Sequence, residues 1–141
     1  MTGETDLDHL ISHMRPMLDP EPYVFCTFAE KTAADLAAYE PVGLFAETEG
    51  MSAILPAEKA RALGLAEAEW FRRITLMVHS SLAAVGLTAA VSATLARAGI
   101  PANVVAAYFH DHVFVPAPQA EEALRLLTCL AEEGGVEISE M

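Results

Sequence analysis

The feature that most constrains the fold of this chain is an internal duplication. Residues 42–63 read as strand, turn, strand, proline and helix, and residues 104–124 repeat the same order. Pro56 and Pro116 stand at the same place in the two stretches, about sixty residues apart, between the second strand and the helix. Proline suits that place because the first turn of a helix leaves its N–H groups without partners. The sequence therefore predicts two related units that each combine a hairpin with a helix.

A further strand precedes each hairpin, over residues 23–28 and residues 74–79. In the second half a helix over residues 87–98 joins that strand to the hairpin, which produces the β-α-β-β-α order of ferredoxin-like domains. In the first half the connection is too short for the same helix. Apolar residues at helical spacing from Leu7 onward predict an additional N-terminal helix that ends by Pro20, and this helix is a candidate substitute.

These patterns place the chain in the α+β class, as two ferredoxin-like repeats with antiparallel sheets and helices packed on one face. We expect the first repeat, with the additional N-terminal helix, over residues 1–68 and the second repeat over residues 69–141. In the second repeat, Ile74 and Leu76 are two positions apart, so their side chains point to the same face of a strand, which we expect to be buried. The last helix is expected to bury one stripe of apolar residues, namely Ala120, Ala123, Leu124, Leu127 and Leu130.

Composition and charge limit the classes of partner. Hydrophobic residues make up 53% of the 141 residues, which is enough for a sizeable core. The chain has 8 Lys and Arg against 20 Asp and Glu, and the net charge of −12 repels both nucleic acid and anionic membrane surfaces. The longest apolar span, residues 82–100, is interrupted by polar residues and glycines, and the acidic N-terminus lacks signal-peptide character. We therefore expect a cytoplasmic protein that binds neither nucleic acid nor membranes.

The cysteines and the exposed edges of the predicted sheets indicate redox state and assembly. Cys26 and Cys129 each lie in an apolar run rather than in a paired motif, which predicts free, buried thiols instead of a disulfide or a metal site.

The helix over residues 85–98 is alanine-rich on nearly all sides, so more than one of its sides needs to be covered by other parts of the protein. Unpaired sheet edges need cover as well. Both features predict a homodimer.

A more specific pattern lies in Tyr23–Thr27 and Phe45–Ser52 of the first half, and in Ile74–Val91 and His110–Pro116 of the second. In these residues the chain resembles the small bacterial ACT-domain proteins with tandem ACT-like repeats, formerly catalogued as a domain of unknown function. The resemblance covers roughly residues 7–132. ACT domains generally bind small ligands, most often amino acids, and pair their sheets side by side. The resemblance implies a regulatory ligand-binding module without a catalytic domain of its own, and therefore not an enzyme.

The resemblance also implies where a ligand binds, at the junction between the first strand of a repeat and the following helix. On this chain the predicted ligand-binding residues are His79, Ser80, Ser81, Val85, Gly86, Leu87 and Asn103. The residue types suit an amino acid, because the positive end of a helix attracts a carboxylate and Gly86 lets a ligand approach the backbone. The alternative is that Ser80 or Ser81 caps the helix and Gly86 serves packing.

Two other functions stay open on the residues alone. One is a structural module whose sheets pair with a partner protein and which binds no ligand. The other is a metal-dependent enzyme, because His110 and His112 share a strand face and His79 offers a third imidazole. We expect no metal and no other cofactor, since a polar hairpin whose imidazoles bond to neighbouring groups accounts for the pair. The sequence contains neither a nucleophile elbow nor a glycine-rich phosphate loop.

Overall fold

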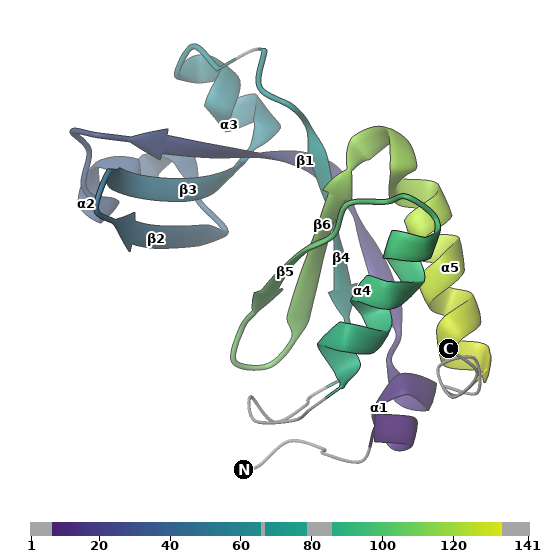
Figure 1. The fold of residues 1–141 in the computed structure, drawn as a ribbon. Helices are drawn as coiled ribbons and strands as arrows, with labels where there is room; N and C mark the ends of the chain where they lie inside the picture. The colour runs from purple at the N-terminus through teal and green to yellow at the C-terminus, as the bar shows by residue number, and fades with distance from the viewer. Residues whose placement is uncertain (1–6, 66, 79–85, 134–141) are drawn as a thin grey trace. The chain divides into compact units, whose positions relative to one another are not determined.

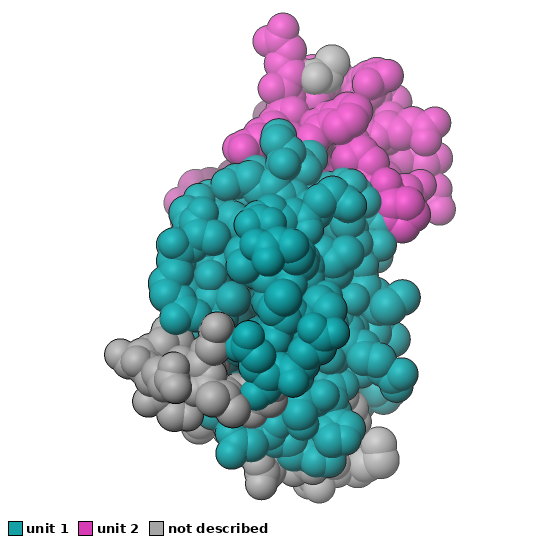
Figure 2. Space-filling model, turned by 90° about the vertical axis from the view of Figure 1, so that its right-hand side faces the viewer, with its two compact units in different colours: residues 1–19, 72–141 teal, residues 20–71 magenta. Residues whose placement is uncertain are grey.

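The computed structural model describes residues 7–65, 67–78 and 86–133. The chain divides into two compact units, shown in different colours in Figure 2. Unit 1 comprises residues 1–19 and 72–141, and unit 2 comprises residues 20–71. The chain thus begins in unit 1, passes through unit 2 and returns to unit 1.

Unit 2 is a three-stranded antiparallel sheet with short helices. Its strands lie in the order β2-β3-β1, and Tyr23 of β1 pairs with Pro56 of β3. The elements are β1 (Pro16–Phe28, which begins in unit 1), α2 (Ala33–Leu36), the 3-10 turn η1 (Ala37–Tyr39), β2 (Gly43–Glu47), β3 (Gly50–Pro56) and α3 (Ala57–Ala62). Its core consists of Val24, Leu36, Ala53, Leu55, Ala57 and Ala60.

Unit 1 packs helices against one face of its strands (Figure 1). The start of β1 is followed across the sheet by β4, β6 and β5. The elements are α1 (Leu7–His13), β4 (Phe71–Leu76), α4 (Leu87–Arg97), β5 (Asn103–Ala106), β6 (Asp111–Pro116), the 3-10 turn η2 (Ala117–Gln119) and α5 (Ala120–Glu133). Ile74 and Leu76 are buried in this core, and so are Ala120, Ala123, Leu127 and Leu130 of α5, with Leu124 partly buried beside them. The predicted faces of β4 and α5 are therefore confirmed, as is the α+β class.

The duplication is visible in the backbone as well. Pro56 has φ −53° and ψ 135° between β3 and α3, and Pro116 has φ −54° and ψ 135° between β6 and η2. The alanines four residues further on, Ala60 and Ala120, are both fully buried. The same dihedral angles at the same step, followed by the same buried small residue, show that the two hairpin–helix stretches are copies of one structure.

The N-terminal region differs from the prediction. The helix ends at His13, and β1 begins at Pro16, so that Pro20 lies within a strand instead of ending a helix. Pairing of β1 with β3 begins only at Tyr23, and the missing N–H group of Pro20 therefore costs no hydrogen bond to β3. The strand begins this early because β1 pairs with β3 and β4, which lie far along the chain. The local spacing of apolar residues carries no information about those partners.

The role considered for the N-terminal helix also differs. The buried side chains of α1, Leu10 and Ile11, belong to the core of unit 1, where α1 contacts α4 and α5. In unit 2 the short helix α2 fills the connection that we judged too short for a full helix. Thr32 caps α2 by accepting a hydrogen bond from the Asp35 amide, and Leu36 is buried. The repeat boundaries at residues 1–68 and 69–141 stay a prediction.

Candidate functional site

The predicted ligand-binding loop lies mostly outside the described residues. This applies to His79, Ser80, Ser81 and Val85. The structure places the ends of the loop, at Val78 after β4 and at Gly86 before α4. Three predicted residues are described: Gly86, Leu87 and Asn103.

Gly86 has a structural requirement for glycine. Its φ of 106° is in the left-handed region, and a Cβ there would lie 2.9 Å from Cδ2 of Leu7 in α1. Its carbonyl oxygen accepts the hydrogen bond of the Ala90 amide at 2.8 Å, which begins the helical pattern of α4. Backbone conformation and packing against Leu7 thus explain the glycine without a ligand, in agreement with the alternative stated for this residue.

Leu87 and Asn103 also make structural contacts. Leu87 is only 3% exposed and belongs to the core of unit 1. Asn103 is exposed on β5, and its side-chain amide donates to the carbonyl oxygen of Phe114 on β6 at 3.3 Å. Neither contact tests ligand binding, and the assignment of the loop as a ligand site stays a prediction.

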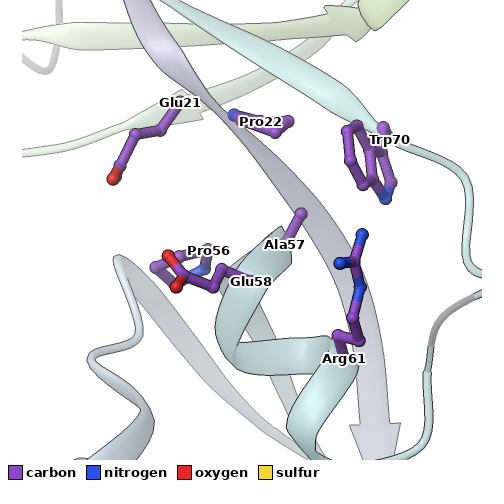
Figure 3. A pocket seen from close by; sticks show the side chains of 7 residues that line it. All are labelled: Glu21, Pro22, Pro56, Ala57, Glu58, Arg61 and Trp70. Carbon is purple, nitrogen blue, oxygen red and sulfur yellow. The ribbon is translucent and has the colours of Figure 1, made fainter.

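A hollow on the surface of unit 2 was not anticipated from the sequence. It encloses about 120 Å³ and gathers residues from β1, the junction of β3 with α3, and the segment before β4 (Figure 3). Its lining consists of Glu21, Pro22, Pro56, Ala57, Glu58, Arg61 and Trp70. No local motif connects these residues, because three separate segments supply them.

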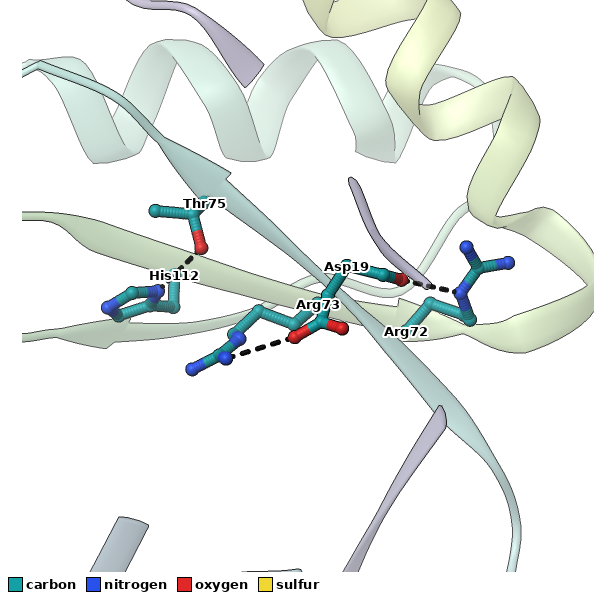
Figure 4. Close-up of polar contacts among 5 residues, drawn as sticks. All are labelled: Asp19, Arg72, Arg73, Thr75 and His112. Atoms are coloured by element: carbon teal, nitrogen blue, oxygen red, sulfur yellow. Dashed lines mark hydrogen bonds and ion pairs between the residues drawn. The ribbon is translucent and has the colours of Figure 1, made fainter. Parts of the chain in front are cut away.

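In unit 1, polar side chains lie on the face of the sheet opposite the helices. His112 pairs with Val105 in the register of β5 and β6, and its neighbour Val113 faces the helix-covered core. The alternation of side chains along β6 therefore directs His112 to the other face. There Nδ1 of His112 and the hydroxyl of Thr75 on β4 share a hydrogen bond of 2.9 Å (Figure 4).

An ion pair extends this group of polar contacts. Nη2 of Arg73 lies 3.0 Å from a carboxylate oxygen of Asp19, and both side chains are half-buried. Nε of Arg72 donates to the backbone oxygen of Asp19 at 3.0 Å (Figure 4). Two arginines at the start of β4 therefore hold the β1 backbone and side chain at Asp19, and the contacts tie the two strands together.

The imidazole of His112 does not bond as we expected for the hairpin. We expected neighbouring backbone or Asp111 as partners for the imidazoles, whereas His112 bonds across the sheet to Thr75. The rings of His110 and His112 are 6.4 Å apart between centroids. Within the described part of the chain, no three His, Cys, Asp or Glu side chains are placed to hold a metal ion. The third imidazole of the metal hypothesis, that of His79, lies outside the described residues.

The environment of His112 disfavours its charged form. Burial lowers the pKa of His112, and the positive charge of Arg73 and the nearby His110 lower it further. Burial raises the pKa of the neighbouring Asp111 carboxyl. At neutral pH the imidazole of His112 is therefore neutral, because the positive charge of Arg73 nearby disfavours a second positive charge.

This environment predicts a pH-dependent loss of stability. Because the folded state holds the pKa of His112 below its usual value of about 6.5, protonation favours the unfolded chain, and stability falls as the pH drops through that value. His112→Gln removes the titrating group, so the variant should lose less stability than the original chain between about pH 7 and pH 5.5. Solvent screening of the half-buried site limits the difference to less than about 1 kcal/mol.

Urea denaturation at each pH measures this effect. Asp111 is present in both proteins, so its contribution cancels in the comparison. Thr75→Val serves as the matched control, because it removes the hydroxyl and keeps the imidazole, and its pH dependence should follow that of the original chain. Parallel curves for the original chain and His112→Gln would show that His112 does not titrate in this range.

The cysteines are free, as predicted, although they are less buried than expected. Both Cys26 and Cys129 are half-buried thiols. The Cys26 thiol donates to the carbonyl oxygen of Ala53 at 3.5 Å, and burial raises its pKa. A raised pKa keeps the sulfur protonated and therefore a poor nucleophile.

Comparisons with known proteins identify the family. Two family models, both described as ACT domain, match residues 2–72 and residues 72–129. The chain therefore belongs to the ACT domain family and carries two such domains in tandem. ACT domains are typically regulatory, ligand-binding modules rather than catalytic ones.

Solved structures agree with this assignment. A protein of unknown function from Vibrio cholerae, described as a possible transport protein, is 46% identical over 89% of this chain and 95% of its own, with a TM-score of 0.80. The ligand-free regulatory subunit of aspartate kinase from Thermus thermophilus is 16% identical over 83% of this chain and 97% of its own, with a TM-score of 0.58. At that identity the second similarity shows the fold alone. A search of curated proteins found no match.

None of the helices that the structure describes is both long enough and apolar enough to cross a bilayer.

Proposed function

We propose that this protein is a cytoplasmic regulatory module of the ACT type that binds a small molecule of the amino-acid class and has no catalytic activity of its own. The observation that carries the proposal is the pair of tandem ACT domains over residues 2–72 and 72–129. A ligand would act by binding one conformation or assembly state more tightly than another, and so shift the equilibrium between them.

The proposed site comprises His79, Ser80, Ser81, Val85, Gly86 and Leu87 of the segment from His79 to Leu87, together with Asn103. Its described end supports this choice, because the first hydrogen bond of α4 runs from the Ala90 amide to the Gly86 oxygen. The amides of residues 87–89 precede that bond and have no partner inside the helix. Thr88 and Ala89 lie exposed in the first turn of α4, and the positive end of a helix favours a carboxylate. Gly86 supports the site by holding the start of the helix and not by contacting the ligand.

A second candidate function is protein interaction through sheet edges, in a homodimer or with another partner. Apolar side chains on the outer strands favour it. Phe45 on the edge strand β2 is 72% exposed, with Leu44 beside it, and Val105 is exposed on the other edge strand, β5. Exposed apolar side chains beside unpaired backbone groups are typical of edges that pair with another chain.

A thermal-melt screen of the full chain against each of the twenty amino acids tests the proposed function. A ligand at about a hundred times its dissociation constant stabilises the folded state by roughly 2.7 kcal/mol, which is a shift of several degrees for a chain of this size. We expect such a shift with at least one amino acid. We also expect Ser81→Phe to abolish the shift, since it replaces a proposed ligand-binding hydroxyl with a bulky apolar ring.

The melting temperature of Ser81→Phe without ligand is the control for folding, and it should stay within a few degrees of the original. Gly86 is unsuitable for this test because a side chain there would contact Leu7. If no amino acid shifts the melting temperature, amino-acid sensing is contradicted and the sheet-edge interaction becomes the better account.

A further inference from the structure

The hollow of unit 2 has a small apolar floor and a charged rim. Ala57 forms the floor and is only 4% exposed, and Pro22 and Pro56 flank it. The floor lies where β3 turns into α3, at a position that carries only a methyl group. The register pairs Tyr23 with Pro56, which brings Pro22 next to this turn. Proline rings with fixed φ angles make these walls stiff.

The rim separates opposite charges. Glu21 and Glu58 lie on one side of the hollow, and Arg61 lies on the other, with its guanidinium directed toward the indole of Trp70 (Figure 3). All four side chains are exposed, so they are accessible to a ligand from solution. The arrangement offers two carboxylates, one guanidinium and one aromatic ring around a single small space.

The charges of the rim are not a by-product of the duplicated fold. The floor residue Ala57 has its counterpart in Ala117, and the buried Ala60 has its counterpart in Ala120. At the rim, by contrast, the residue in the place of Glu58 is Pro118, and the residue in the place of Arg61 is Glu121. The backbone and the buried alanines recur, whereas Glu58 and Arg61 have no counterpart of the same charge in unit 1.

We propose that this hollow is a binding site for a small zwitterion that carries one carboxylate and one ammonium group. Arg61 binds the carboxylate, because a guanidinium donates two parallel hydrogen bonds to it. Glu58 and Glu21 accept from the ammonium group, and the face of Trp70 packs against the apolar part of the ligand. A ligand with only positive charge is disfavoured by Arg61, and one with only negative charge by the two carboxylates and the net charge of −12.

The size of the hollow sets the size of the ligand. Sites for drug-sized molecules enclose about 300–1,000 Å³. The hollow, at about 120 Å³, is below that range and suits a molecule of about the size of a single amino acid. This site lies in unit 2 and shares no residue with the segment from His79 to Leu87, so either site can exist without the other.

The fluorescence of Trp70 reports binding directly, because the chain contains one tryptophan. The full chain is titrated with each of the twenty amino acids at low ionic strength. We expect a saturable change in emission with at least one of them. The same amino acid with its carboxyl group converted to an amide should bind roughly tenfold more weakly, since it loses the charge-assisted hydrogen bonds to Arg61.

Two variants on the same helix make the test specific. Arg61→Met should raise the dissociation constant roughly tenfold, while the apolar part of the side chain is kept. Lys59→Met removes an equal charge from α3 outside the hollow, where Lys59 pairs with Glu40 at 3.2 Å, and should leave the titration unchanged. Ser81→Phe should leave it unchanged as well.

Three results would overturn the proposal. One is no saturable change in emission with any of the twenty amino acids. Another is an equal increase of the dissociation constant in Arg61→Met and Lys59→Met, which would reflect the loss of one positive charge on α3 and not the loss of a contact. The last is loss of the signal in Ser81→Phe, which would place the binding site in the loop. A positive Trp70 titration with no effect of Ser81→Phe keeps this site even if the loop proves not to bind a ligand.

Discussion

Gly50→Ala should destabilise the protein by about 3 kcal/mol or more, because the new methyl group has no space and the backbone angle is unfavourable. A Cβ at this position would lie 2.6 Å from the carbonyl oxygen of Phe28 and 2.9 Å from Cα of Ala29. Both are backbone atoms, so no side-chain rotation relieves the contact. The φ of 152° adds strain for any residue other than glycine. Because Gly50 begins β3, the substitution pushes β3 and β1 apart at the end of their ladder.

Urea denaturation measures this loss, and Gly43→Ala is the matched control. Gly43 lies on β2 beside the same strand, and the nearest atom to a Cβ there is the flexible Cδ1 of Ile54 at 3.2 Å. Movement of that side chain should limit the cost of Gly43→Ala to about 1 kcal/mol. Equal losses for the two substitutions would show that the close backbone approach at Gly50 is relieved in solution.

Leu127→Ala should destabilise unit 1 by about 2–5 kcal/mol. Leu127 is fully buried on α5, in the core that α1, α4 and α5 form against the sheet. The loss combines the transfer of apolar surface to water with the cavity that remains where the surrounding side chains cannot close it. Since this core belongs to unit 1, amide hydrogen exchange should accelerate most in α4, α5 and β6.

Thr128→Ala is the control for Leu127→Ala, because Thr128 is the next residue of the same helix and is exposed. Its hydroxyl donates only to the carbonyl oxygen of Leu124 at 2.8 Å, and its removal should change the free energy of unfolding by less than about 0.5 kcal/mol. A loss below about 1 kcal/mol for Leu127→Ala would mean that α5 does not bury Leu127 in the core of unit 1.

The separation of the two units gives these experiments a common use. Gly50 lies in unit 2 and Leu127 in unit 1. If the units unfold together, both substitutions lower a single transition, whereas separate unfolding would split the transition into two steps in each variant. The two proposed ligand sites also lie in different units. If the units unfold in separate steps, the step that a ligand shifts to higher temperature identifies the unit that binds it.

Much of the fold follows from patterns within a few residues along the chain. The step from Val115 through Pro116 into a helix is encoded where it occurs, and so is the equivalent step at Pro56. The spacing of apolar residues likewise predicts the buried faces of β4 and α5, because a helix or strand has a fixed period wherever it lies. The free thiols were also predicted correctly, since their surroundings in the sequence are apolar.

The candidate sites depend on partners far along the chain, and the sequence alone predicted them incompletely. At Gly86 the residue type suggested close approach by a ligand, and the structure places Leu7 there instead. At His112 the neighbouring residues suggested bonds within the hairpin, and the structure provides Thr75, which lies 37 residues earlier. The hollow of unit 2 escaped prediction altogether, because its seven residues come from three segments.

The sequence by itself therefore determined the repeated architecture, the ACT family and the faces on which helices and strands bury their side chains. These properties depend on local periodicity and on residues that a few neighbours specify. Only the tertiary structure decided that β1 starts at Pro16, that α1 packs into unit 1, and that Glu58, Arg61 and Trp70 surround one space. The physical reason is that such contacts join segments tens of residues apart, and their free energy comes from packing that no local pattern encodes.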